Sequence, residues 1–381
     1  MTLLIDEPHA GGHQAVFLTH LIDGWARHGA PGTLVVSAPS GVLSELLASG
    51  AVLAERPPIP ASGVRGALRL GRAQPLHLLT EAHRPDHVLA MSFEHMAGVW
   101  ARRRRLPGRP AMSALAFHSG AEPPRTVRQR ARDAALGAAL RHPDLAVVHT
   151  LDPLAAPRLV QLGARRVAVV PDPVPAPLSV PPADAVRRAW GVEPDRRMAV
   201  LTGTLDGRKG AAVLLEALLV LPADAARRLA VVLAGRVDAS LRGRVDAGLT
   251  RVRAETRVQV VHREGFVSDA DLAALTTAAD VVLLPYPAQV GSSGFLMRAA
   301  AAGTPVIAPA SGLMGALTRD HHLGQAVDTR SATAVARALA RAVAQPGAGF
   351  RPASASALAR AHSPERFADA LLGPILPGVS P

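Results

Sequence analysis

Residues 284–308 read LPYPAQVGSSGFLMRAAAAGTPVIA, and this stretch decides the fold. The aliphatic run that ends at Pro285 predicts a strand, and the Ala-rich run after Gly294 predicts a helix. The Gly-Thr-Pro sequence at 303–305 predicts the turn into the next strand. Backbone N–H groups and the hydroxyls of Ser292 and Ser293 are expected where the helix begins, an arrangement that binds anions. The stretch therefore predicts an α/β fold with an anion site between a strand and a helix.

Short aliphatic runs alternate with longer Ala-, Leu- and Arg-rich segments of helical period in both halves of the chain. This alternation is typical of parallel sheets whose strands are joined by crossover helices. The strands predicted in the first half are Thr2–Asp6, Thr33–Ser37, His87–Met91, Ala114–His118, Leu145–His149 and Val167–Val170. Those predicted in the second half are Met198–Gly203, Leu229–Ala234, Val258–His262, Val281–Pro285 and Pro305–Pro309. Each half is therefore expected to form its own sheet.

A proline-rich segment, residues 171–182, separates the two halves and is the predicted interdomain linker. With 381 residues, the chain exceeds the length at which one hydrophobic core keeps growing. Two domains are therefore expected, at residues 1–176 and 177–355. After a break at residues 345–354, Ser363 is the predicted N-cap of a final amphipathic helix that covers 364–372.

The formal net charge is +12, which raises the possibility of a nucleic-acid partner. An aromatic content of 3% argues against it, because single strands bind on aromatic stacking platforms. We therefore expect no nucleic-acid partner. The local cluster at Arg102–Arg105 is either a solvated face or a peripheral contact for an anionic membrane or an anionic acceptor.

Cysteine is absent from the sequence, which excludes a disulfide framework and thiolate metal sites. The first residues carry no basic leader, and no stretch approaches about 20 uninterrupted apolar residues. A cytoplasmic protein that does not span a membrane is therefore expected.

A second glycine-rich loop, Leu201–Gly210, follows a predicted strand and precedes the helix predicted over 211–218. It contains Lys209, the only lysine of a chain that otherwise uses arginine for its cations. Because an ammonium and a guanidinium are not equivalent at a phosphate, this placement suggests a site. Together with Arg208, the lysine could neutralise a departing diphosphate. The alternative is that the glycines only cap the helix and the cations lie at the surface.

The loop after the first predicted strand contains Gly11 and Gly12. Paired glycines there would let a phosphate or sugar approach backbone N–H groups at a helix start, although they also suit a simple tight turn. His118 ends another predicted strand, at the edge where open α/β sheets bind ligands. From the residues alone, a core or surface histidine is an equally good interpretation.

Six motifs occur in a familiar order, and together they resemble glycosyltransferase family 4, the retaining GT-B enzymes. They are the Gly-Gly loop, Arg-Lys-Gly at 208–210, Gly-Phe-Val at 265–267, Ala-Ala-Asp-Val-Val-Leu-Leu-Pro at 278–285, Gly-Ser-Ser-Gly at 291–294 and Gly-Thr-Pro-Val-Ile at 303–307. The resemblance covers nearly the whole chain and is densest between residues 198 and 310. It implies two Rossmann-like domains with parallel sheets that face a central cleft.

The resemblance also implies how the parts are used. A nucleotide-sugar donor, most often a UDP- or GDP-sugar, is held mainly by the carboxy-terminal domain, and the acceptor by the amino-terminal domain, which a final helix within 356–381 rejoins. The implied activity is sugar transfer to a hydroxyl or amine with retention of configuration, without a metal or other cofactor. The implied catalytic residues are His118, Arg208 and Lys209. The implied donor-binding residues are Gly11, Gly12, Thr204, Gly265, Phe266, Val267, Gly291, Ser292, Ser293, Gly294 and Arg298.

Three positions depart from the family pattern. Val290 and Arg298 stand where the family has glutamates that contact the donor sugar and the ribose, and Thr204 stands where it has an arginine. A sugar-nucleotide-binding protein without transfer activity, or an epimerase or phosphorylase on the same scaffold, therefore stays open. Asp269 and Asp271 resemble a metal-binding Asp-x-Asp, but Ser268 before them favours a helix start.

Overall fold

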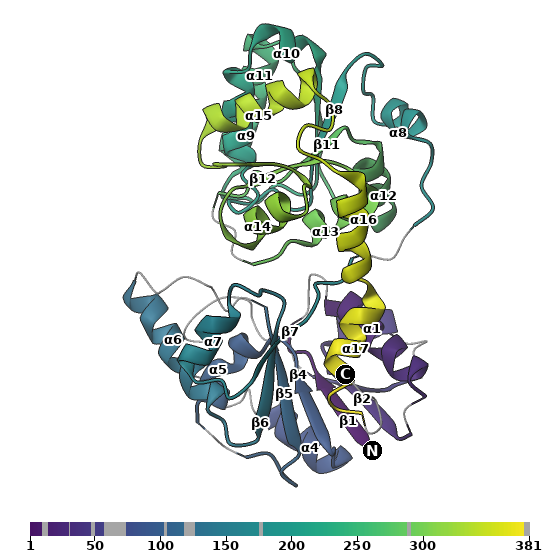
Figure 1. Ribbon diagram of the computed structural model, residues 1–381, viewed down its shortest axis with the longest axis vertical. Helices are drawn as coiled ribbons and strands as arrows, with labels where there is room; N and C mark the ends of the chain where they lie inside the picture. Colours follow the sequence, from purple (N-terminus) through teal and green to yellow (C-terminus); the bar gives the residue numbers. More distant parts are fainter. Residues whose placement is uncertain are drawn as a thin grey trace. The chain divides into compact units, whose positions relative to one another are not determined.

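The computed structural model describes residues 1–9, 14–29, 31–46, 50–56, 74–102, 105–117, 126–174, 178–287 and 291–376. The chain divides into two compact units (Figure 1). The first unit consists of Met1–Pro173 and Ser363–Pro381, and the second of Val174–His362. The division after Pro173 falls within the proline-rich segment at 171–182.

The first unit is built on a parallel sheet of seven strands in the order β3-β2-β1-β4-β5-β6-β7. Its strands are β1 Thr2–Asp6, β2 Thr33–Ala38, β3 Val52–Glu55, β4 His87–Ala90, β5 Ala111–Ala116, β6 Leu145–Thr150 and β7 Val167–Val169. The chain adds strands outward from β1 on one side and then outward from β4 on the other. The order therefore reverses between β1 and β4.

Helices cover both faces of this sheet. The helical segments are α1 Gln14–Arg27, α2 Ser40–Leu43, η1 Ser44–Leu46, α4 Gln74–His83, η3 Phe93–Met96, α5 Ala97–Trp100, α6 Val127–Leu140, α7 Ala156–Leu162 and α17 Pro364–Leu372. Strand β1 contributes side chains to the cores on both faces of the sheet, because successive side chains of a strand point to opposite faces. Leu3 and Ile5 pack with α1 and α17, whereas Leu4 packs in the core on the other face.

The last described helix, α17, packs on α1 within the first unit (Figure 1). Its predicted start is confirmed, since the Ser363 side chain accepts the N–H of Arg366 and a proline stands at the first position. Phe367 is fully buried, with its ring centroid 5.0 Å from that of Phe17. The structure places the return to the first unit at Ser363 rather than at 356, because the preceding helix packs on α13 of the second unit.

The second unit is built on a parallel sheet of six strands in the order β10-β9-β8-β11-β12-β13. Its strands are β8 Arg197–Thr202, β9 Leu229–Ala234, β10 Gln259–Arg263, β11 Val281–Leu283, β12 Val306–Pro309 and β13 Gly324–Val327. Its helices are α8 Ala183–Ala189, α9 Ala211–Leu219, α10 Ala223–Arg228, α11 Arg242–Glu255, α12 Asp269–Ala278, α13 Gly294–Ala302, α14 Gly312–Asp320, α15 Ala332–Ala344 and α16 Pro352–Ala361. Here the strand order reverses between β8 and β11.

Two strands were not predicted, and one was misplaced. The edge strands β3 and β13 consist largely of half-exposed residues, so they lack the buried aliphatic run that marks a central strand. The strand predicted over 114–118 starts at Ala111 and ends at Ala116, because its first residues, Ala-Met-Ser, do not form an aliphatic run although Met112 and Ser113 are buried. The break at 345–354 is shorter than predicted, since α16 already begins at Pro352.

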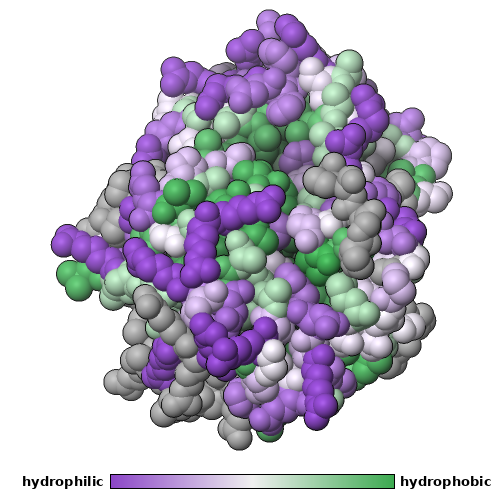
Figure 2. Space-filling view, turned by 60° about the horizontal axis from the view of Figure 1, so that its bottom comes forward, coloured by the Kyte–Doolittle hydropathy of each residue, from purple (hydrophilic) through white to green (hydrophobic). Residues whose placement is uncertain are grey.

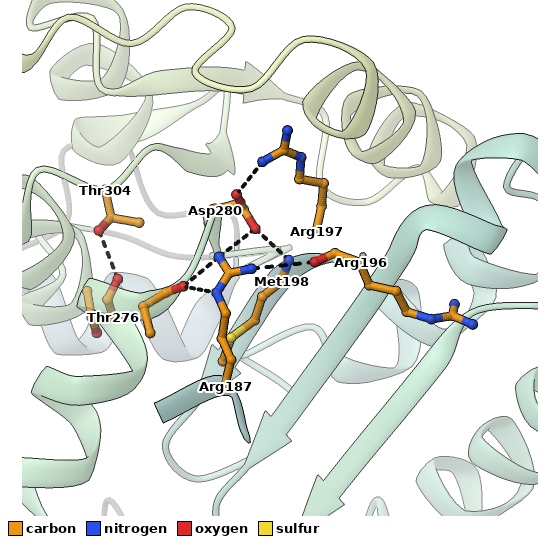
Figure 3. A network of polar contacts seen from close by, with 8 residues as sticks. Arg187, Arg196, Arg197, Met198, Thr276, Asp280 and Thr304 are labelled. Carbon is orange, nitrogen blue, oxygen red and sulfur yellow. Dashed lines mark hydrogen bonds and ion pairs between the residues drawn. The ribbon is translucent and has the colours of Figure 1, made fainter. Parts of the chain in front are cut away.

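A polar network fixes β8 and β11 at their amino ends (Figure 3). The Asp280 carboxylate accepts hydrogen bonds from the backbone N–H of Met198 at 2.7 Å, from Arg187 at 2.8 Å and from Arg197 at 3.1 Å. Arg187 also donates to the carbonyl of Ala278. These bonds set the register of the two central strands, whose opposite ends carry the loops described next.

Candidate functional site

In an open parallel sheet, ligands bind at the carboxyl ends of the strands where the strand order reverses. In both units, side chains that follow the two strands at this point meet each other. In the first unit, Ser92, after β4, donates to both carboxylate oxygens of Glu7, after β1, at 3.0 Å. In the second unit, Lys209, after β8, donates to the Tyr286 hydroxyl, after β11, at 2.6 Å. Each unit therefore has a polar centre at the carboxyl ends of the two strands between which its strand order reverses.

The Lys209 ammonium lies among aromatic rings. Its Nζ is 3.8 Å from the ring centroid of Phe295 and 4.5 Å from that of Tyr286. Burial and, to a smaller extent, the neighbouring Arg208 charge lower the pKa of Lys209 to about 7, while Asp206 acts in the opposite direction. The lysine is therefore poised near its neutral form, and an anion placed beside it would favour the charged form.

Asp206 holds the loop that carries these cations. Its Oδ1 accepts the backbone N–H groups of Arg208 at 2.9 Å and of Lys209 at 3.1 Å. Its other oxygen accepts the Arg208 guanidinium, whose side chain is 69% exposed. The two predicted cations thus lie side by side in one turn, but Lys209 points to the aromatic side chains and Arg208 remains at the surface.

Two glycines allow the loops after β8 and β11 to approach closely. Gly210 has φ +68°, and a Cβ there would lie 1.8 Å from the Pro285 carbonyl oxygen. Gly203 has φ +91°, and a Cβ there would lie 2.9 Å from Cζ of Phe295. Neither position has room for a side chain: Gly210 lets the loop after β8 approach the loop after β11, and Gly203 lets it approach Phe295 of α13.

The predicted anion cradle lies at the start of α13. Ser293 occupies the N-cap position, but its hydroxyl does not cap the helix and is hydrogen-bonded to Tyr286 instead. Gly291 has φ +83°, and Gly294 is the exposed first residue of α13. The helix N-terminus, which favours negative charge, is therefore connected to Lys209 through one buried tyrosine.

The loop after β10 presents the predicted base-contacting residues. Gly265 has φ +140°, Val267 packs against the core, and Phe266 is 87% exposed. Thr204, in the loop after β8, is also exposed. An aromatic ring that is held by a half-buried neighbour and open to solvent can stack on a planar ligand.

Arg298 is engaged within the second unit. Its guanidinium donates to Asp269 at 2.8 Å and is 15% exposed, whereas the Asp269 side chain is 70% exposed. The predicted helix start at Ser268 is confirmed, since its hydroxyl accepts the N–H of Asp271 and caps α12. Among the described residues, no group of three or more His, Asp or Glu side chains could hold a metal ion.

The polar centre of the first unit was not predicted. Burial raises the pKa of Glu7 to about 8, although hydrogen bonds from the His9 backbone and Ser92 oppose the shift. Glu94 is buried and accepts the N–H of Phe117 at 3.1 Å. The next residue, His118, lies outside the described residues, as do Gly11, Gly12 and Val290. The described part of this edge is therefore acidic and largely desolvated.

Tyr286, Phe295 and Glu7 were also missed as site residues, although the sequence contains a signal for Tyr286 and for Glu7. Tyr286 is the only tyrosine of the chain, just as Lys209 is the only lysine. Glu7 directly follows an apolar strand, at the edge where ligands bind. Phe295 follows the glycine of the predicted cradle, where it resembles an ordinary core residue.

Two other surface features bear on the predictions. A cavity of about 470 Å³ lies at the amino ends of β4 and β5, lined by Thr80, Asp86 and Gly108 among others, which is the edge opposite the polar centre. In the predicted basic cluster, Arg103 and Arg104 lie outside the described residues, Arg102 is exposed, and Arg105 pairs with Asp144 at 3.8 Å.

Figure 2 shows long hydrophilic side chains interspersed with apolar residues over one face. In the part of the chain that the structure describes, none of the helices is long and apolar enough to cross a membrane.

Residues 196–345 match the sequence family described as Glycosyl transferases group 1. This segment contains Lys209, Tyr286 and the start of α13, but not the first unit. No curated protein matches the chain in sequence.

Solved structures resemble the chain over both units. HepE from Anabaena, in complex with UDP-glucose, has a TM-score of 0.75 at 16% identity and covers 98% of this chain and 99% of its own. A glycosyltransferase from Rickettsia africae has a TM-score of 0.67 at 14% identity, with 97% and 95% covered. A sucrose-phosphate synthase from Thermosynechococcus elongatus has a TM-score of 0.66 at 17% identity, with 97% and 94% covered. The predicted GT-B fold is thus confirmed, whereas membership of family 4 in particular stays a prediction.

Proposed function

We propose that the protein transfers a sugar from a nucleotide diphosphate sugar to an acceptor hydroxyl or amine, because residues 196–345 match the family described as Glycosyl transferases group 1 and the chain has the GT-B fold. UDP- and GDP-sugars are the proposed donors. In this proposal the second unit provides most of the donor site, and the first unit provides most of the acceptor site. No metal ion or further cofactor takes part in this scheme.

One observation carries the proposal. The only lysine of the chain lies where the strand order reverses, between β8 and β11. Its ammonium is 2.6 Å from the Tyr286 hydroxyl, which is also bonded to the N-cap residue of α13. A cation and a helix N-terminus next to each other suit a diphosphate, because both favour negative charge. The exposed ring of Phe266 is the proposed platform for the base.

In the proposed reaction, the bond between the anomeric carbon and the diphosphate breaks, and the diphosphate leaves with the bonding electrons. Lys209, Arg208 and the backbone at 292–294 stabilise the charge that develops on it. The acceptor atom bonds to the anomeric carbon from the same face and passes its proton to the leaving diphosphate, so that configuration is retained. His118 orients the sugar or the acceptor.

The remaining predicted residues complete the proposed donor site. They are Gly11, Gly12, Thr204, Gly265, Val267, Gly291 and Arg298. The Glu7–Ser92 centre lies at the carboxyl edge of the first unit, and we assign it to the acceptor side.

The test is titration calorimetry of UDP and GDP with the full chain and with Lys209→Ala. Losing a charge-assisted contact costs about 1.5–3 kcal/mol, so the variant should bind roughly tenfold to a hundredfold more weakly. Arg251→Ala is the matched control, because this exposed arginine pairs with Glu255 on the outer helix α11. Affinity within a few-fold of the parent for Lys209→Ala would remove the diphosphate role.

One observation favours a second candidate function. Arg298, at a position where the resemblance implies a ribose-binding glutamate, is bound to Asp269. A sugar-nucleotide-binding protein without transfer activity would fit this arrangement. Donor binding without product in any acceptor screen favours that candidate, whereas release of an epimerised sugar without acceptor indicates an epimerase.

A further inference from the structure

Tyr286 connects the three segments that form the proposed diphosphate site. Its side chain is 3% exposed, its hydroxyl accepts the Lys209 ammonium at 2.6 Å, and the same hydroxyl is bonded to Ser293. Its backbone is also fixed, because the Thr329 hydroxyl donates to the Tyr286 carbonyl at 2.8 Å. These contacts hold the tyrosine in place, and its hydroxyl binds the ammonium.

The Lys209 side chain would otherwise be free to move. A lysine has a flexible four-carbon stem and a strongly hydrated ammonium, so it prefers to remain in water. Here the Phe295 ring and the Tyr286 ring replace part of that hydration, and the tyrosine hydroxyl supplies a strong acceptor. An ammonium that has exchanged water for one hydroxyl and two rings gains strongly from an incoming anion, since it then recovers a full counter-charge.

We propose that Tyr286 is a positioning residue for the Lys209 ammonium, and that a nucleotide diphosphate binds at this site together with a proton that Lys209 takes up. The inference rests on the function proposed above, because it assumes that the diphosphate contacts Lys209. It adds a coupling between donor affinity and pH.

The direction of the coupling follows from the groups around Lys209. In the free protein, burial and the Arg208 charge hold the pKa of Lys209 at about 7, with Asp206 opposing. Burial raises the pKa of Tyr286 above its usual range, so this hydroxyl stays protonated when Lys209 titrates. On the neighbouring segments, Arg298 is paired with Asp269, and Arg330 is paired with Asp328. Of these groups, Lys209 is therefore the one whose protonation changes when an anion binds.

The expected number of protons taken up follows from the pKa of Lys209 in the free protein, which is about 7. At pH 7, about half of the free molecules already carry the proton, so binding takes up about half a proton. Near pH 8.5, most free molecules are neutral, and uptake approaches one proton. In this range the dissociation constant should rise about tenfold for each pH unit. The terminal phosphate of a nucleoside diphosphate loses its last proton near pH 6, so it contributes little above pH 7.5.

The experiment is calorimetry of UDP and GDP with the full chain at pH 8.5, in Tris and in Bicine, whose ionisation enthalpies differ. The difference in observed heat between the buffers gives the number of protons taken up. We expect close to one proton for the nucleotide that binds. Because this measurement uses the unaltered protein, it does not depend on the folding of any variant.

A pH series from 6.5 to 9 with Tyr286→Phe tests the positioning role. The variant keeps the ring but loses the acceptor for the charged form of Lys209, so the pH at which affinity begins to fall should move downward. Thr318→Val is the matched control, because it removes a buried threonine hydroxyl of the same unit that bonds the Met314 carbonyl within α14 and no residue of the proposed site. Its affinity should fall over the same pH range as that of the parent.

The outcomes separate the two proposals. If neither nucleotide binds the parent at any pH, the proposed function fails, and the inference fails with it. If a nucleotide binds but no proton is taken up at pH 8.5, the donor site stands and the coupling is overturned. If Tyr286→Phe weakens binding by the same factor at every pH, the tyrosine has only a structural role.

Discussion

Gly203→Ala perturbs the site through a single methyl group. Gly203 follows β8 with φ +91°, and a Cβ there would lie 2.9 Å from Cζ of Phe295 and 3.8 Å from Cε of Lys209. A positive φ costs an alanine about 1–2 kcal/mol. Displacing a packed ring costs a further ~1–3 kcal/mol. The variant should therefore lose about 2–5 kcal/mol of unfolding free energy.

Gly191→Ala separates the two contributions. Gly191 lies in the same unit with φ +74°, but a Cβ there would meet nothing within 4 Å. It should lose only the backbone contribution, about 1–2 kcal/mol. Urea unfolding followed by circular dichroism, fitted with one transition for each unit, measures both variants. The difference between them reports the displacement of Phe295.

The same methyl group should also weaken nucleotide binding. If Phe295 moves, Lys209 loses a cation–π contact of about 0.5–2 kcal/mol, which is roughly a twofold to thirtyfold loss of UDP or GDP affinity. Gly191→Ala should bind as the parent does. Equal stability and equal affinity of the two glycine variants would refute the packing of Phe295 against the β8 loop.

Two further predictions concern single side chains. Phe266→Ala should weaken UDP or GDP binding about tenfold in calorimetry, since a stacked base contributes ~1–3 kcal/mol; Val127→Ala, at another exposed apolar residue, is the control, and equal affinity of both would exclude stacking. In the folded protein Glu7 keeps its proton to about pH 8, whereas the unfolded chain releases it near pH 4.5, so a rise in pH from 5 to 8 destabilises the parent. Glu7→Gln should therefore show a smaller fall in melting temperature over this range. Identical pH profiles of the variant and the parent would contradict this.

Much of the fold could be predicted because central strands of a parallel sheet are buried on both faces. The run at 229–234 is entirely aliphatic and the run at 2–6 has the aliphatic centre Leu3–Ile5, and both strands were predicted with their observed ends. Local rules also sufficed for α17, whose start depends on Ser363 and the proline after it. The edge strands β3 and β13 were missed, because each is four residues long and half-exposed, and the sequence Gly-Gln-Ala-Val of β13 contains no aliphatic run.

The side chains around Lys209 could not be predicted, because they depend on the order of strands in the sheet. Lys209 and Tyr286 are 77 residues apart and meet only because β8 and β11 are neighbours. The sequence indicated that the lysine was exceptional, but not that it would be turned inward while Arg208 stayed exposed. Side-chain direction and desolvation are properties of the packed unit, and no local pattern encodes them.

The return of α17 to the first unit affects the order in which the protein can be built during translation. The second unit is continuous from Val174 to His362, so the ribosome delivers all of it in one piece. The first unit is made earlier but lacks Phe367 and Leu371, which fill its core. Domains usually fold as they emerge, the amino-terminal one first. Here the first unit cannot complete its hydrophobic core, and part of its apolar surface stays uncovered, until residues 363–372 leave the exit tunnel.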